Sequence, residues 1–109
     1  VLNFFASWCL PCRKEMPALE DAYQTYQDAG LVVIGVGTKD GRRPVMGFAL
    51  STGVTFPIVW DGLGKVYTDY RVMGMPTTYF VNRAGSIESA VIGGVTPERL
   101  EQGIRAIMN

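Results

Sequence analysis

The stretch "VLNFFASWCLPCRKEMP", residues 1–17, decides how the chain begins to fold. Its first seven residues form a short apolar run, which is typical of a buried strand. Two cysteines follow, and apolar residues then recur at helical spacing through Met16 and Leu19. We therefore expect a strand over residues 1–7 and a helix over about residues 10–29, with the cysteine pair at their junction.

The rest of the chain alternates between strand-like and helix-like segments, without an internal repeat. Residues 82–85 have the composition of a hairpin turn, and Thr96 is placed to cap a final helix. This alternation predicts an α/β or α+β domain. The further expected strands cover residues 31–38, 56–61, 77–81 and 86–93, and the further expected helices cover residues 44–52, 64–72 and 96–108.

Composition limits what the chain can be. With 109 residues, 48% of them hydrophobic, it fits one domain over residues 1–109. Ten basic residues balance ten acidic ones, so we expect no nucleic-acid partner. The longest apolar run lies within residues 30–37, short of the roughly 20 residues that span a bilayer, and we expect no membrane insertion by this segment. Because Val1 already lies in an expected strand, we expect a domain truncated at its N-terminus.

The chain contains no histidine, and this excludes several kinds of site. It rules out a Ser/His/Asp triad, a Cys/His pair and a c-type haem attachment sequence. A zinc site within one chain needs more ligands than the two cysteines provide, so we predict no metal site. The reactivity must therefore come from the cysteines or from other side chains.

Cys9 and Cys12 suit reversible disulfide chemistry. Positions one helical turn apart have Cβ atoms about 5–6 Å apart, which is near disulfide geometry. The helix N-terminus stabilises a thiolate at Cys9, the candidate nucleophile, and Cys12 deeper in the turn is the candidate resolving thiol. Pro11 is compatible with the first helical turn, and Trp8 is expected to shield one side of the site. The alternative is a static disulfide, although so short a loop would stabilise the fold little.

Two motifs resemble those of the thioredoxin fold: "WCLPC", residues 8–12, after an apolar strand, and "MPTT", residues 75–78, before another. The fuller pattern of residues 1–20 resembles the TlpA/ResA/CcmG branch of thioredoxin-like proteins. This resemblance implies an α/β thioredoxin fold, with a central mixed sheet flanked by helices and a helix-strand insertion at about residues 42–60. It also implies an extracytoplasmic location, in the bacterial periplasm or anchored to a membrane and facing outside.

The resemblance also implies roles for residues. By position, Cys9 is the exposed nucleophile and Cys12 the resolving thiol, with no cofactor besides their redox-active disulfide. Pro76 matches a proline whose preceding bond is cis, which would leave the Met75 backbone free to pair with an extended substrate segment. The alternative for Pro76 is an ordinary turn proline. The implied substrate-binding residues are Trp8, Pro11, Met75 and Pro76.

Asn3 and Glu15 concern proton transfer. Thioredoxin has a buried Asp six residues before its first cysteine; Asn3 stands at that place and cannot act as a base. Glu15 matches a glutamate of the ResA-like branch, and a shielded carboxylate near a helix start would have a raised pKa and could handle the proton. The alternative is a solvated Glu15 favoured by the helix dipole, and the sequence leaves both open.

The sequence thus predicts an enzyme, a thiol–disulfide oxidoreductase that acts on protein disulfides. Because Leu10 and Pro11 supply no cation to stabilise the thiolate strongly, we expect a reductant, restored by an upstream dithiol. We expect a monomer, and the resemblance implies substrates such as those of cytochrome c maturation. Two alternatives are a noncatalytic binding module with the thioredoxin fold and a peroxiredoxin-like peroxide reductase.

Overall fold

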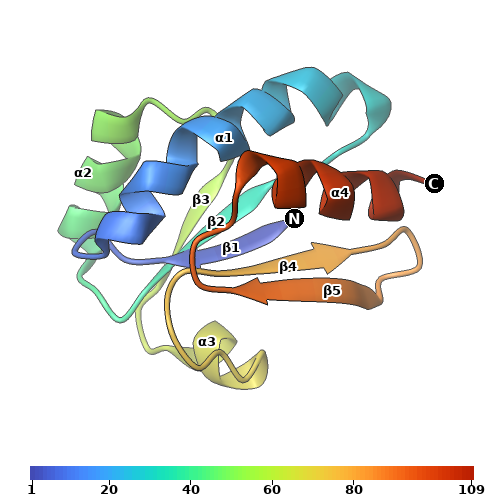
Figure 1. The fold of residues 1–109 in the computed structure, drawn as a ribbon. Helices are drawn as coiled ribbons and strands as arrows, with labels where there is room; N and C mark the ends of the chain where they lie inside the picture. The colour runs from blue at the N-terminus through green and yellow to red at the C-terminus, as the bar shows by residue number, and fades with distance from the viewer.

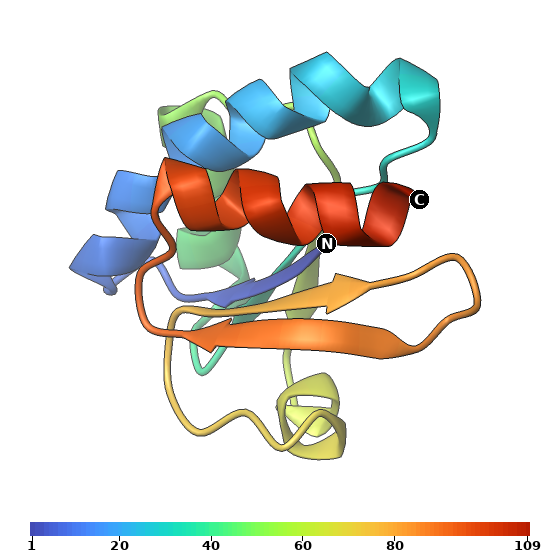
Figure 2. The same cartoon turned by 45° about the vertical axis from the view of Figure 1, so that its right-hand side comes forward.

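One mixed sheet lies between two unequal layers of helices (Figures 1 and 2). The structure is a computed structural model and describes all of residues 1–109. In chain order the elements are β1 (Leu2–Phe5), α1 (Leu10–Tyr26), the 3₁₀ turn η1 (Gln27–Ala29), β2 (Ile34–Thr38), α2 (Arg42–Thr52), β3 (Ile58–Asp61), α3 (Lys65–Asp69), β4 (Thr77–Val81), β5 (Ile87–Ile92) and α4 (Pro97–Met108).

β1 lies in the centre of the sheet, whose strand order is β3-β2-β1-β4-β5. β1, β2 and β3 are parallel, whereas β4 runs antiparallel to β1 and pairs with β5. Phe4, near the end of β1, is opposite Thr77, the first residue of β4. The segment that follows β1 and the segment that precedes β4 therefore meet at the same edge of the sheet.

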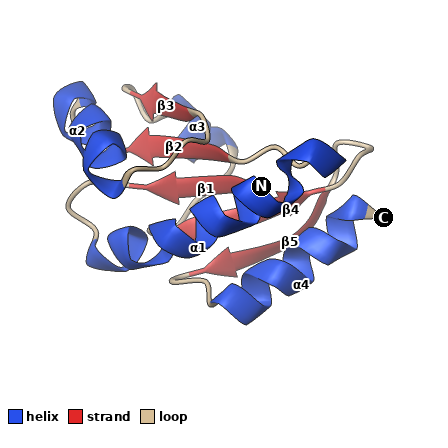
Figure 3. Ribbon diagram, turned by 90° about the horizontal axis from the view of Figure 1, so that it is seen from above, coloured by secondary structure: helices blue, strands red, loops and turns tan.

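Consecutive residues of β1 pack into two separate hydrophobic cores, because side chains alternate between the faces of a strand. Phe5 joins the larger core under α1, α2 and α4, where its ring stacks on Phe48 with centroids 4.9 Å apart. Phe4 points to the opposite face and packs with Val36 and Val72 on the side of α3. Seen from above, α1, α2 and α4 cover one face and α3 lies beyond the other (Figure 3).

This architecture confirms the predicted α/β fold with a mixed sheet flanked by helices. A helix and a strand, α2 and β3, occupy the segment expected to be an insertion. Whether they are an insertion, and whether residues 1–109 form a single domain, stay predictions.

Several predicted boundaries were wrong by a few residues. The strand expected from residue 31 begins only at Ile34, because Leu31 and Val33 are buried in the core without joining the ladder. The helix expected from Pro44 begins at Arg42, and Pro44 fits its first turn because no N–H is required there. The strands expected over residues 1–7 and 56–61, and the helix expected over residues 64–72, are shorter than predicted.

Candidate active site

Cys9 is the N-cap residue of α1, directly after the turn that leaves β1. Its extended backbone lets Cys9 Sγ accept a hydrogen bond from the N–H of Cys12 at 3.3 Å, as a serine oxygen does at other helix N-caps. Pro11 lies in the first turn, where its missing N–H breaks no helical hydrogen bond. A thiolate at Cys9 would therefore be stabilised by this hydrogen bond and by the helix dipole.

Cys9 and Cys12 are joined by a disulfide, and their Cα atoms are 5.3 Å apart. Cys9 keeps 5% of its surface exposed and Cys12 keeps none. The expected order of access is therefore present, but the expectation of an exposed Cys9 was wrong. Cys9 is largely covered because both cysteines are part of the core cluster beneath α1.

Hydrogen bonds join Trp8 and Ser7, which precede the disulfide, to the loop that follows β2. The Trp8 indole Nε1 donates to the Lys39 carbonyl at 3.0 Å, and the Ser7 N–H donates to Asp40 Oδ2 at 2.8 Å. Partial burial of Asp40 favours its neutral form, but hydrogen bonds from Ser7 and Gly41 outweigh this and hold its pKa below the usual value. Sequence reasoning missed Asp40, because a polar loop residue gives no sign of which backbone it will bind.

The Trp8 side chain stays 64% exposed, and two further apolar side chains, each within two residues of Cys9 or Met75, are exposed as well. Leu10 is 61% exposed at the start of α1, and Met73 is 81% exposed in the loop that leads to β4. Exposed apolar side chains gathered near a reactive group are typical of a contact surface for another molecule.

The Met75–Pro76 peptide bond is cis, which confirms the geometry that the resemblance implied. Neither the N–H nor the C=O of Met75 makes a hydrogen bond within the chain. The neighbouring groups are paired: Thr77 Oγ1 donates to the Gly74 carbonyl at 2.7 Å, and the Gly93 N–H donates to the Pro76 carbonyl at 2.8 Å. Met75 therefore has unpaired backbone groups, in a loop at the same end of the sheet as Cys9.

Glu15 is buried, with 4% of its surface exposed, on the turn of α1 that follows Cys12. Its Oε1 accepts from Asn3 Nδ2 at 2.7 Å, and its Oε2 accepts from the Val95 N–H at 2.9 Å. Burial raises the pKa of Glu15 above its usual value, and these two hydrogen bonds only partly oppose the rise. Of the two alternatives that the sequence left open for Glu15, the solvated one is therefore wrong, and the shielded carboxylate is present.

The sequence matches a known protein family over most of its length. The model described as the AhpC/TSA family matches residues 1–90. The chain belongs to the AhpC/TSA family. The resemblance to the TlpA/ResA/CcmG branch is confirmed as well, because relatives of this chain carry the name ResA.

Two curated relatives are ResA thiol-disulfide oxidoreductases. The protein from Oceanobacillus iheyensis is 40% identical over 101 residues, which are 93% of this chain and 53% of the relative. The protein from Geobacillus thermodenitrificans is 35% identical over 106 residues, which are 97% of this chain and 61% of the relative. The chain therefore spans between about half and three-fifths of these relatives' length.

A solved structure of similar sequence comes from Chlorobium tepidum. It is assigned as a thiol:disulfide interchange protein DsbE, superposes with a TM-score of 0.93 and is 31% identical in sequence. The match covers 99% of this chain and 78% of that one.

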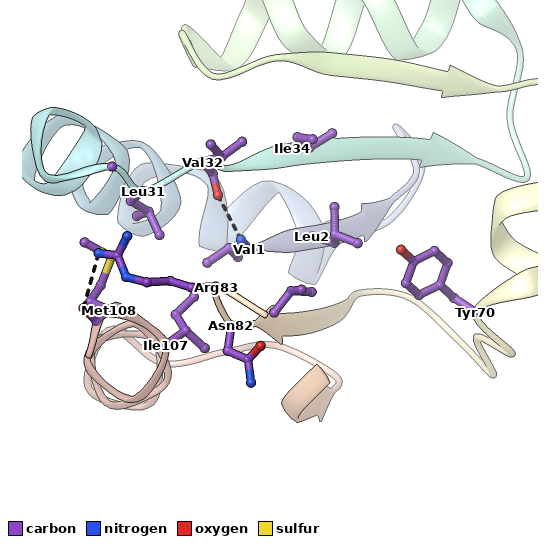
Figure 4. Close-up of a pocket in the computed structure, with 12 residues that line it drawn as sticks. Val1, Leu2, Leu31, Val32, Ile34, Tyr70, Asn82, Arg83, Ile107 and Met108 are labelled. Atoms are coloured by element: carbon purple, nitrogen blue, oxygen red, sulfur yellow. Dashed lines mark hydrogen bonds between the residues drawn. The ribbon is translucent and has the colours of Figure 1, made fainter. Parts of the chain in front are cut away.

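A pocket away from the cysteines contains none of the candidate site residues. Val1, Ile34, Ile107 and others line this apolar pocket of about 320 Å³ (Figure 4). Because Val1 precedes β1 and Cys9 follows it, the pocket lies at the opposite end of β1 from Cys9. No three His, Cys, Asp or Glu side chains lie together as metal ligands. None of the helices has the length and apolar character needed to cross a bilayer.

Proposed function

We propose that this chain is a thiol–disulfide oxidoreductase that reduces disulfides of other proteins outside the cytoplasm. The observation that carries the proposal is the disulfide at the N-terminus of α1, in which Cys9 alone keeps contact with solvent. The names of the ResA and DsbE relatives support the same activity.

The proposed reaction starts from the reduced protein. The Cys9 thiolate attacks one sulfur of the substrate disulfide, so a mixed disulfide forms and one substrate thiolate leaves. Cys12 then loses its proton and attacks Cys9 Sγ, which closes the Cys9–Cys12 disulfide and releases the second substrate thiolate. Two electrons pass to the substrate, and an upstream dithiol returns two electrons to the protein.

Glu15 is the proposed acceptor of the Cys12 proton. The two residues lie three positions apart on one helix, so their Cβ atoms are about 5–6 Å apart, and both side chains are buried. A carboxylate whose pKa is raised by burial is a better base near neutral pH than an exposed one. Glu15 would then pass the proton to the departing substrate thiolate.

The substrate would bind largely through its main chain. The unpaired N–H and C=O of Met75 suit an extended segment that pairs in strand fashion beside Pro76. Trp8, Leu10 and Met73 would provide apolar contacts around it. Such contacts suit unfolded or extended polypeptides, and disulfides of c-type apocytochromes, reduced to the two thiols, are the substrate class that we propose.

The direction of transfer follows from the residues between the cysteines. Leu10 and Pro11 carry no charge, so the Cys9 thiolate lacks the added stabilisation found in strong oxidants. We expect a reduction potential of about −270 to −200 mV or lower. A measured potential near −120 mV would contradict a reducing role.

Reduction of insulin disulfides with dithiothreitol tests the activity. We expect the unaltered protein to accelerate the reaction and Cys9→Ala to abolish the acceleration while circular dichroism shows an intact fold. Ser86→Ala, a small exposed residue in the β4–β5 turn, is the matched control and should keep full activity. An inactive unaltered protein would support the binding-module alternative, and rapid oxidation of Cys9 by hydrogen peroxide without insulin turnover would support the peroxide reductase.

Trapping identifies the partner. In Cys12→Ala the second attack cannot occur, so mixed disulfides should accumulate on Cys9. Recovery of c-type apocytochromes would support the proposed substrate class, and recovery only of other disulfide proteins would contradict it.

A further inference from the structure

Asn3 occupies an unusual position for a side-chain amide. It lies in the central strand β1 with no exposed surface, and both of its Nδ2 hydrogens are used. Nδ2 donates to Glu15 Oε1 at 2.7 Å and to Thr78 Oγ1 at 3.0 Å. The other end of the amide, Oδ1, is buried and has no hydrogen-bond partner. A buried acceptor without a partner is costly, so this arrangement calls for an explanation.

The two ends of the amide suit the two charge states of Glu15. A carboxylate can only accept hydrogen bonds, so it needs Nδ2, whereas a carboxylic acid has an O–H that needs an acceptor. Rotation of the amide by half a turn exchanges its two ends and brings Oδ1 to the place where Nδ2 donates to Glu15. Each orientation leaves one end of the amide unpaired, so the proton on Glu15 decides between them.

Thr78 is compatible with both orientations. Its hydroxyl can accept from Nδ2 and can donate to Oδ1, and the residue is fully buried on β4 beside β1. The Val95 N–H, in contrast, can only donate, and it holds Glu15 Oε2 in place in either charge state. The carboxyl group can therefore change its charge without leaving its position.

We propose that Asn3 is a positioning residue whose side-chain amide reverses when Glu15 takes up a proton, so that it donates to the carboxylate and accepts from the acid. In the reaction the Cys12 S–H bond breaks and the Glu15 O–H bond forms, and Asn3 Oδ1 receives the new hydrogen bond. This role in turnover rests on the function proposed above, whereas the reversal itself does not.

No charged side chain competes for this role. The hydrogen-bond partners of Glu15 are Asn3 from β1 and Val95 before α4, and Thr78 of β4 bonds to Asn3 in turn. On α1 itself the adjacent Lys14 is exposed, and Cys12, one turn before Glu15, is titratable only when it is reduced. Burial raises the pKa of Glu15 and these two neutral donors oppose the rise, and of the two donors only Asn3 is a side chain able to respond to the charge of Glu15.

Nuclear magnetic resonance of the oxidised protein without substrate tests the reversal directly. The chain has three asparagines, at positions 3, 82 and 109, so ¹⁵N-asparagine labelling gives few side-chain signals. We expect the Asn3 amide signals to move with the same midpoint as the Glu15 carboxyl carbon in a pH titration. In Glu15→Gln, which mimics the protonated acid, the Asn3 signals should stay near the low-pH position at every pH.

Two variants separate donation from packing. Asn3→Leu removes the donor at similar volume and should raise the pKa of Glu15. Thr78→Val leaves the Asn3–Glu15 hydrogen bond in place and should change the pKa of Glu15 less. Asn3 signals that do not follow Glu15, or equal shifts in both variants, would overturn the proposal. If Asn3→Leu does not fold, the titration of the unaltered protein decides alone. Insulin turnover is measured separately, so loss of the proposed function would not be mistaken for failure of the reversal.

Discussion

Glu15 makes the proposed reaction depend on pH at the scale of a single residue. Burial raises the pKa of this carboxyl, so the acid keeps its proton to a higher pH than an exposed glutamate does. Below that pKa it cannot take the proton of Cys12, and the rate of insulin reduction should rise as pH increases through it. Glu15→Gln should slow turnover by about 10²-fold and remove this rise, as rate–pH profiles will show.

The matched control is Glu98→Gln, because Glu98 is exposed in the first turn of α4 and makes no side-chain hydrogen bond. It should leave both the rate and the profile unchanged. A folded Glu15→Gln protein with the profile of the unaltered one would contradict a proton-handling Glu15.

Asp61 is a second buried carboxyl with a different task. It accepts from the N–H groups of Val66 and Tyr67 at 3.1 and 2.9 Å and from the Thr38 hydroxyl at 3.1 Å, which fixes the start of α3. Desolvation favours its neutral form, but these hydrogen bonds prevail and hold its pKa below the usual value. Its stabilising effect is therefore fully present above the unfolded-state pKa of about 3.9 and is lost as pH falls through the folded-state pKa.

We accordingly expect Asp61→Asn to lower the free energy of unfolding at pH 7 by about 1–2 kcal/mol. The loss should shrink towards pH 3, because below about pH 3.9 the unfolded chain binds a proton at Asp61 that the folded protein binds less readily. Urea denaturation at both pH values measures this, with the exposed Asp21→Asn as the control. An equal loss at both pH values would show that the charge of Asp61 is not what stabilises α3.

The residues of the site show how far sequence reasoning reaches. The spacing of Cys9 and Cys12 was sufficient to predict their disulfide, since both lie in one helical turn. For Glu15 the sequence left burial undecided, because its partner Val95 is 80 positions away and binds through a backbone N–H. A backbone donor has no residue type, so only the fold reveals it.

At the scale of elements, two glycines in helices should respond oppositely to the same change. In Gly103→Ala of α4, the new Cβ would overlap the buried ring of Phe80, so we expect a loss of about 1–2 kcal/mol despite the better helix former. In Gly47→Ala of α2, the Cβ would meet nothing within 4 Å, and we expect a gain of about 0.5–1 kcal/mol. Urea denaturation compares the two, and a stabilised Gly103→Ala protein would contradict the tight α4–β4 contact.

Element types were predictable where periodicity and caps agree, as in α4, whose N-cap Thr96 accepts from the Arg99 N–H as expected. The first and last residues of the elements were less predictable, because a residue can be buried in the core without pairing in the sheet. Leu31 and Val33 are as apolar as a strand requires, yet they pack beneath the helices before the ladder with β1 begins. Composition alone does not distinguish these two uses of an apolar residue.

At the scale of the whole molecule, the site depends on the sheet topology. Antiparallel β4 brings Met75 and Pro76 to the end of β1 that carries Cys9, and the segment before α4 brings Val95 over Glu15. The family resemblance predicted the first of these meetings. The second joins β1, α1 and the segment before α4 into one buried network, so changes at the site are expected to affect global stability.

The coupling between disulfide formation and folding gives a prediction for the stability of the two redox forms. A disulfide that forms more readily in the folded than in the unfolded chain stabilises the oxidised fold by the same free energy, at about 1.4 kcal/mol per 30 mV. Because we expect a reductant, the oxidised protein should be the more stable form and should melt higher, by about 5 °C for each kcal/mol. Calorimetry of the oxidised and dithiothreitol-reduced protein measures the difference, and Cys9→Ala, which forms no disulfide, should melt at one temperature in both conditions. A reduced protein that melts above the oxidised one would mean that the fold favours the dithiol, and the chain would then be an oxidant of its partners.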